Sequence, residues 1–220
     1  MATRQRVADV SPATRWAVEP SAVVLAGIDE SPTLLEPEQR ARQLRLRQAQ
    51  DRDDFLAARV LTQRMVAQAS GYPADGVRFS QHCDRCGGPD GRPLIEGSSG
   101  LHISWSHAAG WVAAVVSEQP CGIDVEPVSD RGPLFNVLTF EEQQEVRSVP
   151  AGSAQSRAFL RLWVRKEALV KAAGTGLSEP VALARLDIRD DKVAYAGQHW
   201  HLTDLTTPSD VVAAIAVRSS

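Results

Sequence analysis

Two acidic side chains, Asp124 and Glu126, stand two residues apart in the segment Gly122–Pro127. In an extended strand both carboxylates would share one face, while Ile123 and Val125 would share the other. Two ionised carboxylates side by side repel each other, so in a cleft they need a cation. Oxygen ligands favour Mg²⁺, which often keeps water and shares its coordination shell with phosphate. A pair with this spacing is also compatible with an ordinary solvated strand edge.

A second charged pair follows about forty residues later in a segment with helical periodicity, Phe159–Lys171. Helical spacing places Glu167 four residues after Trp163, at the rim of the apolar face, and Lys171 four residues further on. A carboxylate and an ammonium would thus emerge side by side. The alternative is a plain surface ion pair, which contributes little to stability. The arginines of this segment are expected on the opposite, solvent-facing side: Arg157, Arg161 and Arg165.

The elements that must position these side chains follow from hydrophobic periodicity and turn signals. Val23–Ile28 is the expected first strand, after a loose entry over residues 1 to about 20. Three further strands are expected to form a meander: His102–Ser106, Trp111–Ser117 and Cys121–Val125. Three helices and a last strand complete the prediction, with a capping box at Thr139 and Glu142: helices over 36–70, 139–147 and 156–173, and a strand over 211–217.

The chain also shows a weak internal repeat. The segment WVAAVVS at residues 111–117 resembles VVAAIAV at residues 211–217, an offset of 100 residues. The helix that starts at Phe55 resembles the helix that starts at Phe159, an offset of 104 residues. Both offsets agree with two similar halves that meet near residue 118, and a site between the halves is then expected.

Composition narrows the class of protein. The chain has 220 residues, 43% hydrophobic and 23% charged, which is typical of one large or two small globular domains. A net charge of −3 argues against a nucleic-acid-binding protein. The longest apolar run, Trp111–Val116, is too short to span a membrane, and the N-terminus lacks the apolar core of a secretory signal. We therefore expect a soluble, cytoplasmic protein.

Three cysteines, Cys83, Cys86 and Cys121, are an odd number and too few for a disulfide scaffold. The spacing of Cys83 and Cys86, preceded by His82, is that of half a zinc site. A single CxxC offers two ligands, His82 is a poor third, and no second pair follows at the required spacing. An ordinary loop is therefore favoured over a zinc knuckle.

Taken together, the acidic and helical segments resemble the Sfp-type (surfactin-synthetase-type) 4′-phosphopantetheinyl transferases. The family pattern is (I/V)G(I/V)D-x-E followed by W-x-x-K-E-(A/S)-x-x-K, and GIDVE and WVRKEALVK stand in register with it. The resemblance covers residues from about 50 to 180 and extends to three shorter segments: Trp105-Ser106-His107, Gly91-Arg92-Pro93 and Gly174–Leu177. It departs from the family at Arg92, which replaces a lysine and keeps the charge with a different bonding geometry.

The resemblance implies an α+β fold of two similar α/β halves, each a helix packed on a small, mostly antiparallel sheet, related by pseudo-two-fold symmetry. Residues 1–117 would form the N-terminal half with the basic residues that bind coenzyme A. Residues 118–220 would form the C-terminal half with the metal-binding acids and the catalytic helix. The active site would lie between the halves. A duplicated chain can complete such a site alone, so a monomer is expected.

The resemblance also implies an activity: Mg²⁺-dependent transfer of the 4′-phosphopantetheine arm of coenzyme A to a serine of an apo acyl or peptidyl carrier protein, with release of 3′,5′-ADP. Mn²⁺ is a possible substitute for Mg²⁺. The pathway is left open among polyketide, non-ribosomal peptide and fatty acid biosynthesis. The carrier is expected to dock on Pro127–Gln155, where Leu134, Phe135 and Phe140 are apolar.

By the same resemblance, three carboxylates bind the metal: Asp124, Glu126 and Glu167. Glu167 is the best base for the carrier serine, directly or through a metal-bound water, and Glu126 is the alternative. Lys171 neutralises the leaving phosphate, and Lys166 gives support or a partial phosphate contact. Coenzyme A is expected to meet Asp124, Lys171 and a further set of side chains: Arg52, Arg59, Arg92, Ser106 and His107. The other arginines of residues 40–47 are assigned to a solvated helix face.

Two rival functions stay open beside this one. The first is a binding module that keeps a coenzyme A pocket without catalysis, and the intact acids and Lys171 argue against it. The second is a phosphohydrolase that uses the same acids on a small molecule and releases free phosphopantetheine.

Overall fold

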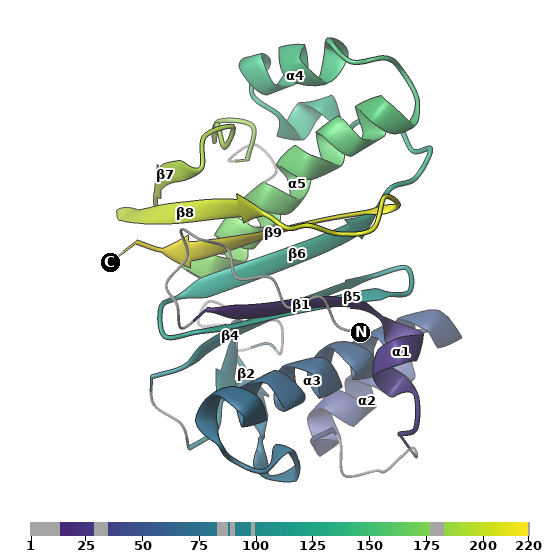
Figure 1. Cartoon of the computed structure of the whole chain (residues 1–220), viewed down its shortest axis with the longest axis vertical. Coiled ribbons are helices and arrows are strands. Elements are labelled where there is room, and N and C mark those ends of the chain that lie inside the picture. The colour runs from purple at the N-terminus through teal and green to yellow at the C-terminus, as the bar shows by residue number, and fades with distance from the viewer. Residues whose placement is uncertain are drawn as a thin grey trace.

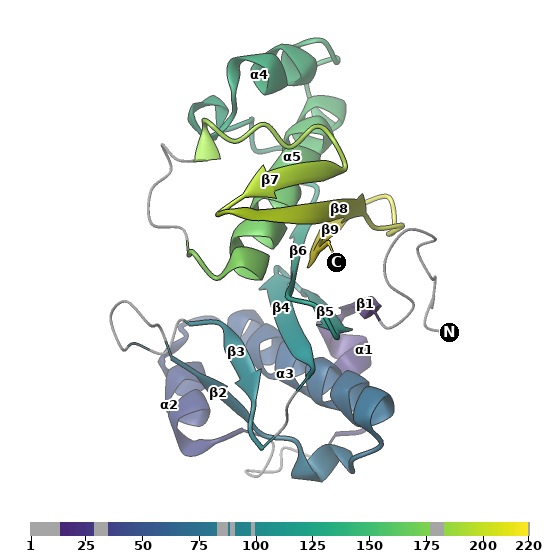
Figure 2. The ribbon, with the colours of Figure 1, turned by 90° about the vertical axis from the view of Figure 1, so that its left-hand side faces the viewer.

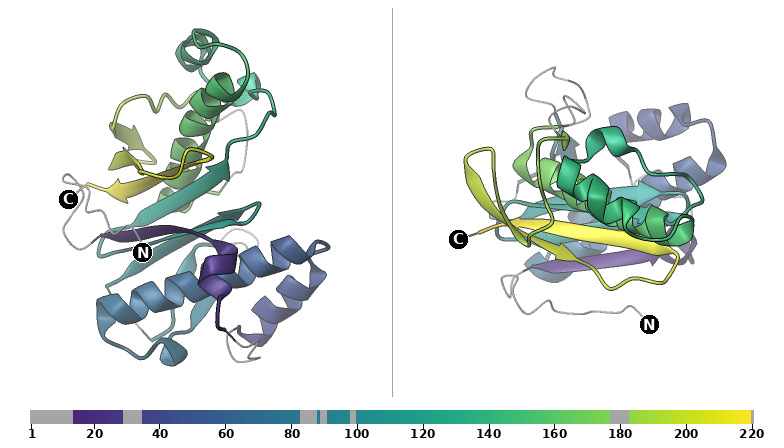
Figure 3. Two further views of the ribbon diagram at one scale, coloured as in Figure 1. Left: turned by 45° about the vertical axis from the view of Figure 1, so that its right-hand side comes forward. Right: turned by 90° about the horizontal axis from the view of Figure 1, so that it is seen from above.

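The computed structural model stacks two sheets between two layers of helix (Figure 1). In the order of the layers, α3 (Ala49–Ser70) covers the sheet β1-β5-β4, and α5 (Ser153–Ala173) covers the sheet β6-β9-β8-β7. Figure 3 shows both sheets between these two helices. The structure describes the following residues: 14–28, 35–82, 88, 91–97, 100–176 and 183–219.

The first sheet is antiparallel and belongs to the N-terminal part of the chain. It comprises β1 (Arg15–Pro20), β5 (Trp111–Ser117) and β4 (His102–Ala108). The β4–β5 hairpin turns at Ala109 and Gly110, which both have positive φ. Smaller elements surround it: α1 (Ser21–Leu25), α2 (Pro37–Arg45), the 3₁₀ turn Ala74–Gly76, and the short hairpin β2 (Phe79–Gln81) and β3 (Pro93–Ile95).

The second sheet is antiparallel too, and the last hundred residues build it. Its strands are β6 (Cys121–Pro127), β9 (Val211–Arg218), β8 (Gln198–Asp204) and β7 (Lys192–Tyr195). Between β6 and α5 the chain forms a 3₁₀ turn, Phe135–Val137, and α4 (Phe140–Arg147). The predicted capping box is confirmed: Thr139 accepts a hydrogen bond from the Glu142 amide, and Glu142 accepts one from the Thr139 amide.

Three predictions about the elements are wrong. The first strand is Arg15–Pro20, within the segment expected to be a loose entry, and Ser21–Leu25 is a helical turn that buries Val24 and leaves Val23 exposed. The expected helix over residues 36–70 breaks after Arg45, because α2 buries none of its own residues and folds back beside α3. The expected meander does not form, since β6 leaves β5 after Pro120 and pairs with β9.

The two sheets have the same strand order. In each, the first strand pairs with the last, and the last pairs with the strand before it: β1-β5-β4 and β6-β9-β8. In each, the long helix follows the first strand in the chain. This shared order agrees with two similar halves within an α+β fold.

An apolar cluster fills the space between the sheets. It includes side chains from β5, β6 and β9: Ala113, Val115, Cys121, Ile123, Val125, Val211, Ala213, Ile215 and Val217. At its edge β4 and β6 lie side by side, and the Ser104 hydroxyl accepts a hydrogen bond from the Ile123 amide at 3.3 Å (Figure 2). The motif residues of β4 and β6 therefore meet where the two sheets join.

Gly122 lets β6 approach α5 more closely than any other residue would. A Cβ atom at this position would overlap the carbonyl oxygen of Ala168 and lie 2.5 Å from the amide nitrogen of Ala172. Strand and helix are thus in backbone contact, which fixes Asp124 relative to Glu167 and Lys171. Among the described residues, no helix is long and apolar enough to cross a membrane.

Candidate functional site

The predicted site residues Ser106, Asp124 and Lys171 meet at the joint between β4, β6 and α5. Lys171 Nζ lies 2.6 Å from Asp124 Oδ1 and donates a second hydrogen bond to the carbonyl of Ile123 at 3.2 Å. Ser106 Oγ donates to the same Asp124 oxygen at 2.7 Å. One oxygen of a buried carboxylate is therefore shared between an ammonium and a hydroxyl.

The other two predicted acids, Glu126 and Glu167, are electrostatically coupled to Asp124. Burial raises the pKa of Glu167 to about 7, and the charges of Asp124 and Glu126 add to the rise against the pull of Lys171. Burial and Asp124 likewise raise the pKa of Glu126 to about 7, although a hydrogen bond from Trp163 opposes the rise. Two carboxyl groups whose ionisation is hindered by burial and by a neighbouring carboxylate form a site in which a cation is favourable.

The unpaired oxygens of the acids fit a divalent cation. Asp124 Oδ2 and Glu167 Oε1 are buried and have no hydrogen-bond partner within the described part of the chain. No three His, Cys, Asp or Glu side chains of the described ranges gather closely enough to enclose a metal ion by themselves. Mg²⁺ is usually held by one or two carboxylates, with water and substrate phosphate as its other ligands. The donor set therefore fits an ion shared with a phosphate group.

A basic cluster adjoins the acids through His107 on β4. Burial lowers the pKa of His107, and the charges of Arg59, Lys171 and Arg42 lower it further, while Asp54 raises it. The His107 ring also packs edge-on against the Phe55 ring of α3, with centroids 6.4 Å apart. His107 therefore lies between the lysine of the acidic site and two arginines.

Arg59 carries a buried guanidinium in this cluster. The residue is 2% exposed, and its guanidinium carbon lies 3.2 Å from the ring centre of Phe55 and 4.9 Å from that of Trp105. It donates to the Phe55 carbonyl at 2.8 Å and to Gln81 Oε1 at 3.4 Å. Burial and the charge of Arg42 lower the Arg59 pKa to about 9. An anion at this position would stabilise the charged form of Arg59 and offset the repulsion from Arg42.

A pocket of about 420 Å³ opens beside the two arginines. Its lining includes Gln39 and Arg42 of α2, Arg59 of α3, and Phe79 and Gln81 of β2, together with three acidic residues: Glu36, Glu38 and Glu96. Sequence reasoning missed Arg42 and left it on a solvated helix face. The structure instead places its guanidinium carbon over the Phe55 ring, 5.7 Å from the ring centre. No signal in the sequence separates it from Arg40 and Arg45, because all three are arginines in a mostly polar helix without an apolar face.

Two predicted coenzyme A residues have backbone partners instead. Arg52 donates to the carbonyls of Leu46 and Arg47, at 2.9 and 3.2 Å, and so closes the turn between α2 and α3. Arg92 donates to the carbonyl of Ala172 at the C-terminal end of α5. These contacts place neither arginine against His107. Their predicted contact with phosphate stays a prediction.

Two other side chains of α5 differ from the sequence-based expectations. Arg165, predicted on the solvent side, is completely buried and pairs with Asp191 at 2.9 Å and Asp204 at 3.3 Å, because the bend before β7 and the end of β8 lie against that side of the helix. Lys166 is also buried and pairs with Glu142 at 2.7 Å, which favours support over a phosphate contact. Cys83 and Cys86 lie outside the described residues, and Cys121 is buried as a free thiol.

Comparisons with known proteins agree on one family. Residues 120–216 match the family model described as the 4′-phosphopantetheinyl transferase superfamily, a range that contains both motif segments. The 4′-phosphopantetheinyl transferase psf-1 of Bacillus pumilus is 29% identical over 143 residues, which cover 64% of this chain and 58% of that protein.

Two further relatives carry the same name. A 4′-phosphopantetheinyl transferase of Bacillus subtilis is 28% identical over 156 residues, covering 70% of this chain and 66% of its own length. The 4′-phosphopantetheinyl transferase HetI of Nostoc sp. is 28% identical over 193 residues, which cover 83% of this chain and 78% of that protein. The alignments with the two Bacillus proteins thus span less than two thirds of either relative. With both motifs in register, these matches support a place for the chain in the Sfp-type 4′-phosphopantetheinyl transferase family.

Proposed function

We propose that this chain is an enzyme that transfers the 4′-phosphopantetheine arm of coenzyme A to a serine of an apo acyl or peptidyl carrier protein. The reaction releases 3′,5′-ADP and depends on Mg²⁺, with Mn²⁺ as a substitute. One observation carries the proposal: unpartnered, buried oxygens of Asp124 and Glu167 adjoin Lys171, and the basic cluster of His107, Arg59 and Arg42 continues from it.

The three acids and Lys171 have different roles in the proposed reaction. Asp124 and Glu167, whose buried oxygens have no partner within the described part of the chain, would hold Mg²⁺, and Glu126, the third proposed ligand, would have to move closer to join them. The bound ion would draw charge from the phosphate under attack. The serine oxygen forms a bond to the phosphorus that bears the pantetheine arm, and the pyrophosphate bond to the nucleotide breaks. Glu167 accepts the serine proton, and Glu126 is the alternative base. Lys171 stabilises the negative charge of the departing phosphate.

Coenzyme A would lie along the joint between the sheets. Its phosphates meet His107, Arg59 and Arg42, and the pocket beside the two arginines receives part of the nucleotide. Ser106 holds Asp124 and contacts the ligand beside it. Arg52 and Arg92 are proposed as further phosphate contacts that must first leave their backbone carbonyls.

The proposed architecture is two halves, residues 1–117 and 118–220, related by a pseudo-two-fold axis, with the active site between them. The common strand order of the two sheets supports it. The chain is proposed to act as a monomer in the cytoplasm. The carrier docks on Pro127–Gln155, where the side chains of Leu134 and Phe140 are 58% and 69% exposed.

One experiment tests the activity. The chain is incubated with coenzyme A, Mg²⁺ and a panel of apo carrier proteins, and each carrier is then weighed by mass spectrometry. The proposal expects a gain of one phosphopantetheine on a serine, and no gain with the Asp124→Asn variant. Free phosphopantetheine would instead indicate a phosphohydrolase. Coenzyme A binding without any modified carrier would indicate a binding module.

A further inference from the structure

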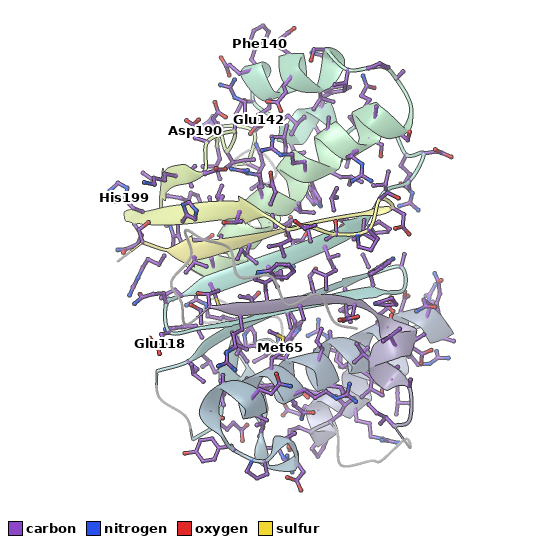
Figure 4. All side chains as sticks on the ribbon, viewed as in Figure 1. Met65, Glu118, Phe140, Glu142, Asp190 and His199 are labelled. Carbon is purple, nitrogen blue, oxygen red and sulfur yellow. The ribbon has the colours of Figure 1, made fainter. Side chains whose placement is uncertain are left out.

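Lys166 and Glu142 form an ion pair that is closed to solvent on every side. Both side chains have 0% exposure, and Lys166 Nζ lies 2.7 Å from Glu142 Oε2. Lys166 comes from the middle of α5, while Glu142 comes from the first turn of α4. Figure 4 shows Glu142 on the inner side of α4 and Phe140 at its outer edge. The pair therefore joins the helix of the proposed site to the helix that carries Phe140.

The hydrogen bonds of this pair are complete. The ammonium donates to Glu142 and to the carbonyls of Val137 and Leu183, at 3.0 and 2.6 Å, so its three donors have three acceptors. The carboxylate also accepts from the amides of Thr139 and Ile188, at 2.8 and 3.2 Å. With all three donors engaged inside the protein, Lys166 has none to offer a phosphate.

These bonds attach the main chain close to the exposed apolar side chains. Leu134, Phe135 and Phe140 flank the 3₁₀ turn Phe135–Val137 (η3) and the start of α4, and we term them the η3–α4 face. Each lies within three residues of Val137 or Thr139. The η3–α4 face is exposed at Leu134 and Phe140, while the intervening Val137 and Leu138 are buried in the apolar cluster that contains Leu162 and Leu169 of α5. The face is therefore attached to α5 both by apolar packing and by the polar contacts of Lys166 with Glu142 and the Val137 carbonyl.

Lys166 and Glu167 are consecutive residues of α5 that point to different sides. The Glu167 side chain interacts electrostatically with Asp124 and Lys171, whereas the Lys166 side chain forms an ion pair with Glu142. We propose that Lys166 is a positioning residue that holds the η3–α4 face in a fixed position relative to Glu167. The inference rests on the proposed function, in which this face receives the carrier whose serine must reach Glu167.

A kinetic comparison of two neighbouring variants tests the inference. Lys166→Met removes the tie, and Arg165→Met is the matched control, since Arg165 is equally buried but pairs with Asp191 and Asp204 instead. We expect Lys166→Met to raise the KM for the carrier by about tenfold, with the KM for coenzyme A unchanged. Arg165→Met should leave both constants unchanged.

Hydrogen exchange gives a readout that needs no activity. The amides of Leu138 and α4 should exchange faster in Lys166→Met than in Arg165→Met. If the native chain modifies no carrier, the proposed function fails, and this comparison still decides whether the tie exists. If Lys166→Met does not fold, Glu142→Gln replaces it, because glutamine keeps the volume and loses the charge.

Three results would overturn the inference. Equal carrier KM values for the two variants would make Lys166 an ordinary stabilising residue. A higher KM for coenzyme A in Lys166→Met would give Lys166 a phosphate contact. Unchanged exchange at α4 would show that the face is held by other contacts.

Discussion

Lys171 Nζ and Asp124 Oδ1 lie 2.6 Å apart across the contact between α5 and β6. The lysine is 31% exposed and the aspartate only 6%, so the ion pair has one side open to the site and one side closed. Asp124 Oδ2 stays unpartnered. A carboxylate held by a lysine through one oxygen keeps the other oxygen for a cation. This arrangement underlies the first prediction.

Asp124→Asn should abolish transfer and leave the fold intact. The amide cannot bind a cation as a carboxylate does, whereas losing the partly exposed ion pair costs little because the repulsion with Glu126 and Glu167 is relieved. Mass spectrometry of the carrier measures transfer, and thermal unfolding without Mg²⁺ measures stability. A large drop in unfolding temperature would make Asp124 a structural residue.

Arg42→Gln should weaken binding of coenzyme A much more than binding of the carrier. Each lost hydrogen bond to a charged group costs about 1.5–3 kcal/mol, which is about 10- to 150-fold in KM if KM follows affinity. Arg40→Gln is the control, because Arg40 is exposed on the same helix. The substrates to compare are coenzyme A and dephospho-coenzyme A. An equal loss on both would mean that Arg42 does not recognise the 3′-phosphate.

The protein without Mg²⁺ should lose stability as the pH rises from 4.5 to about 7. Burial raises the pKa of Glu167 from 4.5 to about 7, so the protonated acid is favoured in the folded state. Its contribution is complete below the unfolded pKa and disappears as the pH passes the folded pKa. The free energy of unfolding should fall by at most about 3 kcal/mol for this group. Urea unfolding measures it, and Glu167→Gln should reduce the dependence to the part that Glu126 contributes.

Gly122→Ala should destabilise the chain by at least about 1–3 kcal/mol, the usual cost of overpacking, because the added methyl group meets the backbone of α5. Gly132→Ala is the control, since nothing lies within 4 Å of a Cβ at that position. Chemical denaturation of both variants gives the difference. Equal stability of the two would show that β6 and α5 can separate without cost.

Glu167→Gln should lower transfer by about 10²–10⁴, the usual loss when a general base is removed. Coenzyme A should still bind through the basic cluster, with one molecule per chain. At an offset of 104 residues Gln63 and Ala67 stand opposite Glu167 and Lys171, and Gln63 is buried with its amide donating to the Val77 carbonyl. Calorimetry measures the stoichiometry. Two molecules per chain would show that the first half also forms a site.

Local signals in the sequence were sufficient for part of this structure. The capping box at Thr139 and Glu142 involves residues three apart, and it occurs as predicted. The strand alternation around Asp124 and the helical spacing of Glu167 and Lys171 predict the elements that carry these side chains, and the structure brings Asp124 and Lys171 into contact.

The errors arise where distant segments decide the outcome. Arg165 is buried against Asp191, in the bend before β7, and Asp204, at the end of β8, and helical periodicity alone carries no information about these later residues. β6 pairs with β9 because both bury apolar residues between the sheets, whereas its proximity to β5 in the sequence favours a meander. The assignment of Arg42 to a solvated face is an error of the same kind, since only its contact with Phe55 in the folded chain distinguishes it from the neighbouring arginines.

The apolar cluster between the sheets has a consequence for how the chain assembles. A cut in the link between β5 and β6 would leave each fragment with one wall of this cluster, such as Val115 on one side and Ile215 on the other, facing water. Such surfaces resemble the interfaces of obligate dimers, which are like a protein core divided in two. The two fragments should therefore aggregate alone and reassociate when mixed. In the intact chain, the short link keeps one wall at high effective concentration near the other.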